Sequence, residues 1–355
     1  MSLIPATILT GFLGSGKTTL LKRVLEEAHG QKIAVIENEF GEENIDSDIL
    51  VSETKEQIIQ MSNGCICCTI REDLRGALRD LAEKKRKGEL DFDRVVIETT
   101  GLADPGPVAQ TFFMDDEIAE SYLLDSILTL VDAKHAAGQL NDRQEARRQV
   151  GFADQIFISK TDLVAKDEVD ALMHRIKHMN PRAPQKAVHF GEVALSEVFD
   201  LRGFNLNAKL DIDPDFLKDE EHDHAGHDHA DHEHGEHCDH PSHAHDHATH
   251  GHHHHHEDDV KSFVFKSDKA FDAAKLEDFL GAIVNIYGPR MLRYKGVLNM
   301  KGTDRKVIFQ GVHQLMGSDL GPAWGADEKR TNKMVFIGID LPKDIFLQGM
   351  EQCLV

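Results

Sequence analysis

The stretch that decides the fold is Gly11-Phe-Leu-Gly-Ser-Gly-Lys-Thr18, near the beginning of a chain of 355 residues. It fits the pattern G-x-x-x-x-G-K-[ST], and it follows the β-rich run Ala6 to Leu9 and opens the helical pattern Thr18 to Ala28. Its glycines let the backbone curl so that N–H groups and the positive end of the helix converge on phosphate oxygens. The stretch predicts a phosphate-binding loop between a strand and a helix.

Each residue of this loop has an expected task. Lys17 is expected to reach the β and γ phosphate oxygens, and Thr18 is expected to be a ligand of Mg²⁺. A glycine-rich turn without any ligand is the alternative, and the strand-loop-helix context opposes it. The residues that we expect to bind the nucleotide here are Gly11, Gly14, Ser15, Gly16, Lys17, Thr18 and Thr19.

A second nucleotide motif is an apolar strand pattern, Arg94 to Ile97, that ends in Glu98 and is followed by Gly101. A carboxylate at this position holds Mg²⁺ directly or through water, and the glycine N–H can sense the γ-phosphate. A glutamate at a strand end is otherwise often a solvated terminus, but the phosphate loop favours the functional interpretation. We therefore predict a catalytic set of Lys17, Thr18, Glu98 and Gly101, with Leu102 to Pro105 as a switch segment.

The base specificity is indicated by Ser159-Lys-Thr-Asp162, which follows the apolar run Gln155 to Ile158. GTPases carry Asn-Lys-x-Asp at this place. Asp162 would accept hydrogen bonds from the N1 and N2 donors of guanine, which adenine lacks, and Lys160 would lie along the base. Ser159 replaces the usual Asn and removes an amide from the network that braces the loop, which would soften base selectivity. The motif favours GTP over ATP.

The order of patterns along the chain predicts an α/β fold. Strand-like runs alternate with amphipathic helical patterns up to about residue 210, which is typical of a doubly wound, mostly parallel sheet with right-handed crossovers. After a stretch without apolar periodicity, strand and helix patterns return and indicate a smaller α+β domain. We predict a P-loop domain over 1–215, a His/Asp/Glu-rich disordered linker over 216–259 and a C-terminal domain over 260–355.

Three of the five cysteines stand together in Gly64-Cys-Ile-Cys-Cys68, which we expect in a loop after the second strand and before a helix. Thiols this close in sequence rarely reach disulfide geometry. Three thiolates at Cys65, Cys67 and Cys68 suit Zn²⁺ and other borderline metals, and they need one further ligand to complete a tetrahedron. A redox cluster and buried inert cysteines are the alternatives.

Carboxylates that could supply this ligand stand in Glu37-Asn-Glu-Phe-Gly-Glu42, where the second strand runs into the usual place of the first switch. Either Glu37 or Glu42 could complete the metal site or receive the incoming metal. An exposed acidic loop is the simpler interpretation. The functional one would let one segment contact both nucleotide and metal, a coupling typically worth about 1 to 3 kcal/mol.

The predicted linker holds 17 of the 23 histidines. Imidazoles beside carboxylates in a flexible chain bind Zn²⁺, Ni²⁺, Co²⁺ or Cu²⁺ weakly at interchangeable sites. A metal reservoir is the functional interpretation, and a solvated low-complexity spacer is the alternative. The linker ligands that we predict are His222, His224, His227, His229, His232, His234, His237, His240, His243, His245 and His247.

Charge and hydropathy limit the partners. The net charge is −22, and 13 acidic residues with no Lys or Arg fall between Asp219 and Asp259. This balance opposes nucleic-acid and anionic-membrane partners, which need clustered basic residues. The chain shows neither a basic leader nor an apolar span of membrane length, so we expect a cytoplasmic protein.

These motifs together resemble the CobW-like GTPase metallochaperones, which are relatives of the urease and hydrogenase nickel-insertion GTPases, and the resemblance covers essentially the whole chain. It implies slow GTP hydrolysis with Mg²⁺ and delivery of a metal to a client protein, with zinc first and Co²⁺ or Ni²⁺ as alternatives. By resemblance, Cys65, Cys67 and Cys68 are the primary metal ligands and Glu37 and Glu42 are further contacts. A second copy of the chain is another expected partner, as a homodimer.

Two other functions compete with this expectation. A metal buffer with a vestigial nucleotide site would bind several metals independently of GTP. A P-loop kinase would transfer phosphate to a small molecule, but it leaves the three cysteines unexplained. Cys353 carries no motif that we can interpret.

Overall fold

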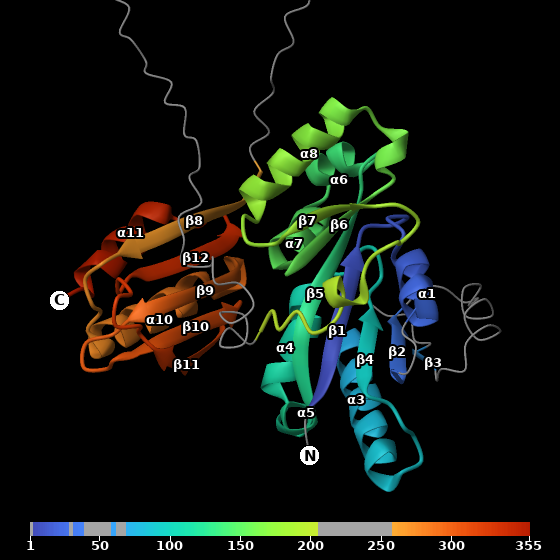
Figure 1. The fold of residues 1–355 in the computed structure, drawn as a ribbon, viewed down its shortest axis with the longest axis horizontal. Helices are drawn as coiled ribbons and strands as arrows, with labels where there is room; N and C mark the ends of the chain where they lie inside the picture. Colours follow the sequence, from blue (N-terminus) through green and yellow to red (C-terminus); the bar gives the residue numbers. More distant parts are fainter. Residues whose placement is uncertain (1–2, 28–30, 39–57, 62–68, 205–257) are drawn as a thin grey trace, which may run out of the picture.

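The computed structural model describes residues 3–27, 31–38, 58–61, 69–204 and 258–355. These residues form two β-sheets, each with its own helices, that pack side by side (Figure 1). The first is a parallel α/β sheet and the second is an antiparallel sheet with two helices. The predicted fold class, a doubly wound parallel domain with a smaller α+β domain, is confirmed for the described part of the chain.

In the described ranges, the first sheet has seven strands in the order β3-β2-β4-β1-β5-β6-β7, and all neighbouring strands are parallel. Its centre is β1, which lies between β4 and β5, so the carboxyl ends of these three strands meet at one edge. That edge is where ligands bind in open parallel sheets. The strands are β1 (Ile4–Gly11), β2 (Ile33–Asn38), β3 (Ile58–Met61), β4 (Arg94–Glu98), β5 (Tyr122–Asp132), β6 (Gln155–Ser159) and β7 (Gln185–Val188).

Helices cover both faces of this sheet, because its strands bury side chains on both sides. In β1, for example, Ile8 belongs to one hydrophobic cluster and Leu9 to the other, where it packs with Leu20 and Leu21 of the first helix. Such two-sided burial gives the near-continuous apolar runs of a parallel sheet. The helices are α1 (Lys17–Glu27), α3 (Thr69–Lys87), α4 (Pro105–Met114), α5 (Asp116–Ser121), α6 (Ala136–Asp142), α7 (Gln144–Phe152) and α8 (Lys166–Met179).

The second sheet is antiparallel, in the order β11-β10-β9-β12-β8. One face packs on its own helices through an aromatic cluster that includes Phe263, Phe336 and Phe346. The other face places Leu292 and Ile337 in the core of the first domain. The elements are β8 (Val260–Ser267), α10 (Ala273–Tyr287), β9 (Met291–Asn299), β10 (Arg305–Val312), β11 (Leu315–Ala323), β12 (Asn332–Ile339) and α11 (Lys343–Gln352).

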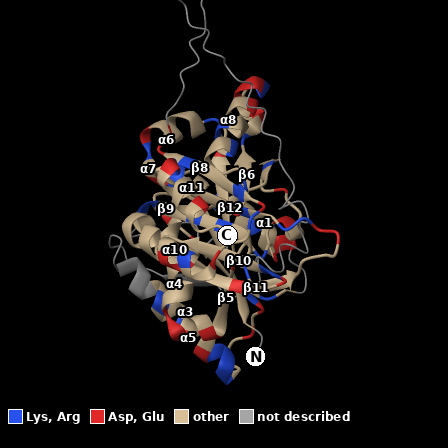
Figure 2. Ribbon diagram, turned by 90° about the vertical axis from the view of Figure 1, so that its left-hand side faces the viewer, with Lys and Arg blue, Asp and Glu red and all other residues tan. Residues whose placement is uncertain are grey.

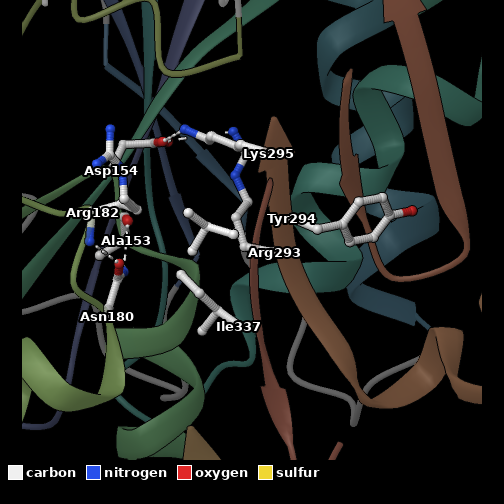
Figure 3. Close-up of a pocket in the computed structure, with 9 residues that line it drawn as sticks. Ala153, Asp154, Asn180, Arg182, Arg293, Tyr294, Lys295 and Ile337 are labelled. Carbon is white, nitrogen blue, oxygen red and sulfur yellow. Dashed lines mark hydrogen bonds and ion pairs between the residues drawn. The ribbon is translucent and has the colours of Figure 1, made fainter. Parts of the chain in front are cut away.

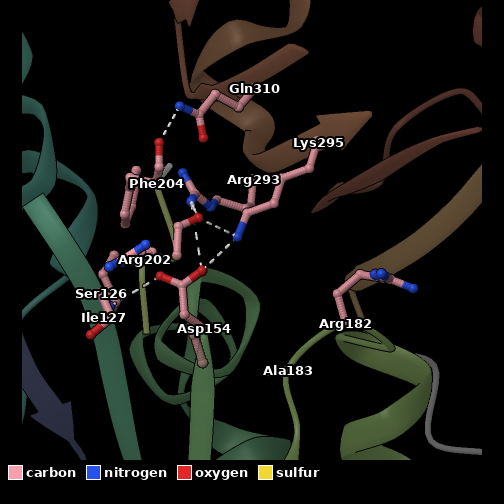
Figure 4. Close-up of polar contacts among 12 residues, drawn as sticks. Ser126, Ile127, Asp154, Arg182, Ala183, Arg202, Phe204, Arg293, Lys295 and Gln310 are labelled. Atoms are coloured by element: carbon pink, nitrogen blue, oxygen red, sulfur yellow. Dashed lines mark hydrogen bonds and ion pairs between the residues drawn. The ribbon is translucent and has the colours of Figure 1, made fainter. Parts of the chain in front are cut away.

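A buried charge cluster joins the two domains (Figure 4). Asp154, which precedes β6, accepts a hydrogen bond of 2.6 Å from Nζ of Lys295 on β9. Arg293 Nη2 lies 3.6 Å from the same carboxylate, and its guanidinium carbon lies 3.4 Å from the centre of the Phe204 ring. Burial lowers the pKa of Arg293 to about 10. The small pocket of Figure 3 is lined by this cluster and lies at the joint between the domains.

Several elements lie outside the sequence expectations. The short strand β3, the strand β7, the helices α4 to α7, the strand β11 and the terminal helix α11 were not among the predicted elements. The strand β11 contains two glycines, a proline and an aspartate and is largely exposed at the sheet edge, a composition that hides a strand in the sequence. The helix α4 begins with Pro105-Gly-Pro, which reads as a turn.

Candidate functional site

The phosphate loop has the backbone geometry that its glycines permit. The strand β1 ends at Gly11 and α1 begins at Lys17. Gly11, Gly14 and Gly16 have φ values of +146°, +73° and +98°, which L side chains rarely adopt. A Cβ at Gly11 would lie 2.4 Å from the carbonyl oxygen of Leu130 on β5. Glycine is therefore required at this position if the loop is to lie against β5.

Two side chains of the phosphate loop, Lys17 and Thr18, form hydrogen bonds that fix their positions. Lys17 Nζ donates to the carbonyl oxygen of Gly11 at 3.0 Å. Thr18 Oγ1 donates to Glu98 Oε1 at 3.1 Å, although 80 residues separate the two in the chain. A hydroxyl and a carboxylate are the hard oxygen ligands that Mg²⁺ prefers, so the residues present fit this ion.

Gly101 packs directly against the phosphate loop. A Cβ at this position would lie 2.5 Å from the backbone nitrogen of Leu13. The predicted switch segment ends in structured backbone, because Asp104 is the N-cap of α4, accepts a hydrogen bond from Gly106 N at 2.9 Å and pairs with Arg148 at 2.6 Å. Residues 104 and 105 therefore belong to the start of a helix that is tied to α7.

The loop after β6 holds the phosphate loop from the opposite side. Ser159 is buried and its hydroxyl donates to Ser15 O at 2.7 Å. Lys160 has φ +57° and its Nζ donates to Gly14 O at 2.8 Å. The hydrogen bond of Ser159 shows that its side chain contacts the phosphate loop, and the expectation that Ser159 softens base selectivity stays a prediction. Asp162 is half exposed, with Nδ1 of His189 at 3.7 Å.

One residue of this site was missed in the sequence. Asp132, the last residue of β5, is buried and accepts hydrogen bonds from Lys160 Nζ at 2.7 Å and from His135 Nδ1 at 2.9 Å. Burial alone would raise the pKa of Asp132, but these hydrogen bonds outweigh it and hold the pKa below its usual value. The signal was available, because an acidic residue directly follows the apolar run of the strand.

The structure also brings Glu37 to the nucleotide side of the sheet. The strands β2 and β4 are parallel neighbours, and Glu37 stands in register with Glu98. Residues in register on adjacent strands project from the same face of a sheet, about 5 Å apart. Both side chains are partly buried. A residue expected to contact the metal thus lies beside the residue expected to contact Mg²⁺.

The remaining metal residues lie outside the described part of the chain. These are Cys65, Cys67, Cys68, Glu42 and all the linker histidines named above. The described elements on either side of the cysteines are β3 and α3. The sequence analysis expected the motif after the second strand, but it follows a third strand, β3. Among the residues that the structure describes, no group of three or more His, Cys, Asp or Glu side chains could hold a metal ion.

Two further expectations concern the rest of the chain. Cys353 is buried in the core of the second domain, where its Sγ donates to Gly349 O at 3.1 Å and burial raises its pKa. Within the described ranges, no helix combines the length and the apolar character that a membrane crossing requires.

Comparison with known proteins shows which protein family this chain resembles. Residues 5–186 match the family model described as CobW/HypB/UreG, nucleotide-binding domain, and residues 260–354 match that of the cobalamin synthesis protein cobW C-terminal domain. The chain is 40% identical over 347 residues to the zinc chaperone YjiA of Escherichia coli, covering 97% of this chain and 96% of that protein. It is 31% identical to the zinc chaperone CobW of a Sinorhizobium species, covering 95% and 93% of the two chains.

Two other similarities extend the comparison. The crystal structure of the Zn(II)-bound YjiA GTPase from E. coli superposes with a TM-score of 0.74 over the full length of both chains, at 34% sequence identity. The zinc-regulated GTPase metalloprotein activator 1 of Schizosaccharomyces pombe is 37% identical over 208 residues, which cover 57% of this chain and 50% of that protein. The predicted enzyme class, a P-loop GTPase, is confirmed at the level of this family.

The phosphate loop, the Thr18–Glu98 pair, the parallel sheet and the second antiparallel domain all agree with these matches, and the chain belongs to the CobW/HypB/UreG family of nucleotide-binding proteins.

Proposed function

We propose that this protein is a GTPase that carries a transition metal, zinc before Co²⁺ or Ni²⁺, and transfers it to a client protein as GTP is hydrolysed. Cys65, Cys67 and Cys68 would hold the metal, with Glu37 and Glu42 as further contacts. The relatives named as zinc chaperones support zinc as the cargo and a client as the recipient. A homodimer, a cytoplasmic location and the domain boundaries at residues 215 and 259 stay predictions.

The observation that carries this proposal is the register of Glu37 with Glu98 on neighbouring parallel strands. The segment that runs on to Glu42 starts from the strand next to the one that ends in Glu98. If the contacts of Glu98 change when the nucleotide changes, Glu37 lies on the neighbouring strand and can respond to that change. Two sites linked so closely can share a coupling free energy, which acts equally on both ligands.

The residues present would divide the work of hydrolysis. Lys17 and the backbone N–H groups of the phosphate loop would bind the phosphates, and Thr18 and Glu98 would hold Mg²⁺, which would neutralise charge on the phosphate oxygens. Lys160 and Asp162 would orient the guanine. The Lys17 amine, which donates to Gly11 O and Phe12 O, would exchange these carbonyls for phosphate oxygens.

The experiment is GTP hydrolysis by the metal-stripped protein, titrated with Zn²⁺, Co²⁺ and Ni²⁺ in a chelator buffer. We expect the rate to change with one metal at a low free concentration. The Cys65→Ser, Cys67→Ser, Cys68→Ser triple variant should lose this response, and the matched control Cys238→Ser, a cysteine outside the motif, should keep it. A rate indifferent to every metal would favour the metal buffer, and a rate that rises with an acceptor molecule would favour the kinase.

A further inference from the structure

Two histidines on α8, which the sequence analysis left unassigned, lie in contact with each other. His174 and His178 are one helical turn apart, both are exposed, and their Nε2 atoms are 2.9 Å from each other. Their rings meet edge to face with centroids 4.5 Å apart. Residues four apart lie on the same face of a helix, so this contact follows from the spacing. Two imidazole nitrogens at this separation are close enough to bind one metal ion together, once each ring turns its Nε2 lone pair toward the ion.

The distance between the two nitrogens favours some coordination geometries over others. At a metal–nitrogen distance of about 2.05 Å, atoms 2.9 Å apart subtend an angle of about 90° at the metal. That is the angle between neighbouring ligands in square-planar and octahedral complexes, which Cu²⁺ and Ni²⁺ adopt. A tetrahedral Zn²⁺ site would need the nitrogens about 0.4 Å further apart, which small side-chain rotations can supply.

The backbone under the pair is held in place from several sides. α8 is amphipathic, and Leu172, Ile176 and Met179 bury its other face. Ser262 Oγ of β8 donates to the carbonyl oxygen of His178 at 3.1 Å. Arg175 forms two hydrogen bonds with Asp258, at 2.6 and 2.9 Å. The two Cα positions are therefore fixed before any metal binds, which lowers the entropic cost of binding.

The pair lies on an exposed helix that carries charges of both signs. Figure 2 shows α8 at the end of the molecule, and its first turn carries Asp167 and Glu168, whereas its last turn carries Lys177. Within the described ranges, the pair does not belong to a group of three or more His, Cys, Asp or Glu side chains that could hold a metal ion.

We propose that His174 and His178 form a surface site for a divalent transition-metal ion, distinct from the cysteine motif, with Ni²⁺ and Cu²⁺ preferred over Zn²⁺. Binding would place both Nε2 atoms on the metal, and the proton that one Nε2 donates to the other would move to Nδ1 of its own ring, so that each neutral imidazole keeps one N–H. The site rests on its own geometry and does not require that the proposed metal-transfer function be correct.

The test is footprinting of the full, metal-stripped chain with diethyl pyrocarbonate, which acylates accessible imidazoles, in buffered free Ni²⁺. Trypsin cuts after Arg175 and Lys177, so mass spectrometry reads His174 and His178 on separate peptides. We expect Ni²⁺ to reduce modification of both at least fivefold, with the same midpoint. His135 and His189, which lie elsewhere on the described surface, should change less than twofold.

The variants decide whether the two rings act together. In His174→Asn, the Ni²⁺ midpoint for protection of His178 should rise at least tenfold, and His178→Asn should do the same for His174. Circular dichroism checks that α8 is intact. Unchanged protection of His178 in His174→Asn would overturn the proposal, and so would an absence of protection at millimolar Ni²⁺ in the native chain. The triple cysteine variant should keep the protection, which separates this site from the proposed GTPase-coupled one.

Discussion

Two buried aspartates at opposite ends of the neighbouring parallel strands β5 and β6 make similar ion pairs in different settings. Asp132 closes β5 at the nucleotide edge and accepts from Lys160 at 2.7 Å, and Asp154 precedes β6 and accepts from Lys295 at 2.6 Å. The Lys160 side chain is 36% exposed, whereas that of Lys295 is 10% exposed. The Asp132–Lys160 pair, called the open pair below, faces a loop that can admit a ligand. The Asp154–Lys295 pair, called the sealed pair, is enclosed between the two domains.

The comparison shows that a buried Asp–Lys ion pair can support ligand binding at one end of the strands and the packing of two domains at the other end. At the carboxyl ends of the strands, loops leave room around Lys160, whose Nζ also contacts the phosphate loop at Gly14 O. At the opposite end, Lys295 Nζ has a second acceptor in Gly203 O at 2.6 Å, and the Asp154 carboxylate also accepts from Ile127 N. The sealed pair should therefore dominate stability, and the open pair should influence the nucleotide.

The largest expected effect is on the sealed pair. Asp154→Ala removes the buried carboxylate that Lys295 and Arg293 contact at 2.6 and 3.6 Å, and we expect a loss of about 3 to 5 kcal/mol in the free energy of unfolding. Urea denaturation followed by circular dichroism measures it. The matched control is Asp80→Ala, which breaks the exposed Lys84–Asp80 pair on α3 and should cost less than about 0.5 kcal/mol. Equal effects of the two substitutions would contradict the comparison.

A smaller effect, with a pH dependence of known sign, is expected at the open pair. Asp132→Asn should cost about 1.5 to 3 kcal/mol at pH 7, because hydrogen bonds to a charged group are lost. The pKa of Asp132 is lowered in the folded protein, so its stabilisation is present above the unfolded-state pKa of about 3.9 and is lost as the pH falls through the folded value.

Unfolding free energies of the native chain and of Asp132→Asn, measured from pH 7 down to pH 3, check this expectation. The difference between the two proteins should be constant near neutral pH and should shrink below about pH 4. Asp80→Asn serves as the exposed control and should show a difference below about 0.5 kcal/mol throughout. A difference that grows as the pH falls would show that the Asp132 carboxylate is not held in its charged form.

The smallest effect is expected at the contact between the loop after β6 and the phosphate loop. Ser159→Ala removes the buried hydrogen bond to Ser15 O, so the loop after β6 no longer holds the phosphate loop through this side chain. A loss of about 1 kcal/mol corresponds to a roughly fivefold weaker affinity for a fluorescent GDP analogue. Ser262→Ala, on the distant β8, should leave this affinity unchanged. An unchanged affinity in Ser159→Ala would show that this hydrogen bond does not contribute to nucleotide binding.

Much of the nucleotide side was readable from the sequence, because its signals are local. The phosphate loop, Glu98 at a strand end and the Ser159 to Asp162 loop each occupy a few consecutive residues whose neighbours are typical of a strand or a helix. The same holds for the cysteine motif as a sequence pattern. Weakly patterned elements such as β3 and β11 were missed, because four residues or an exposed edge carry too little hydrophobic periodicity.

The sequence by itself determined the family and the parallel architecture, because the family follows from short motifs and the architecture follows from the order of strand and helix patterns along the chain. Only the tertiary structure placed Glu37 beside Glu98, Lys160 on Asp132 and Lys295 on Asp154, contacts that join segments 28 to 141 residues apart. The physical reason is that strand order and domain packing decide such neighbours, and both depend on the burial of whole faces rather than on any short motif.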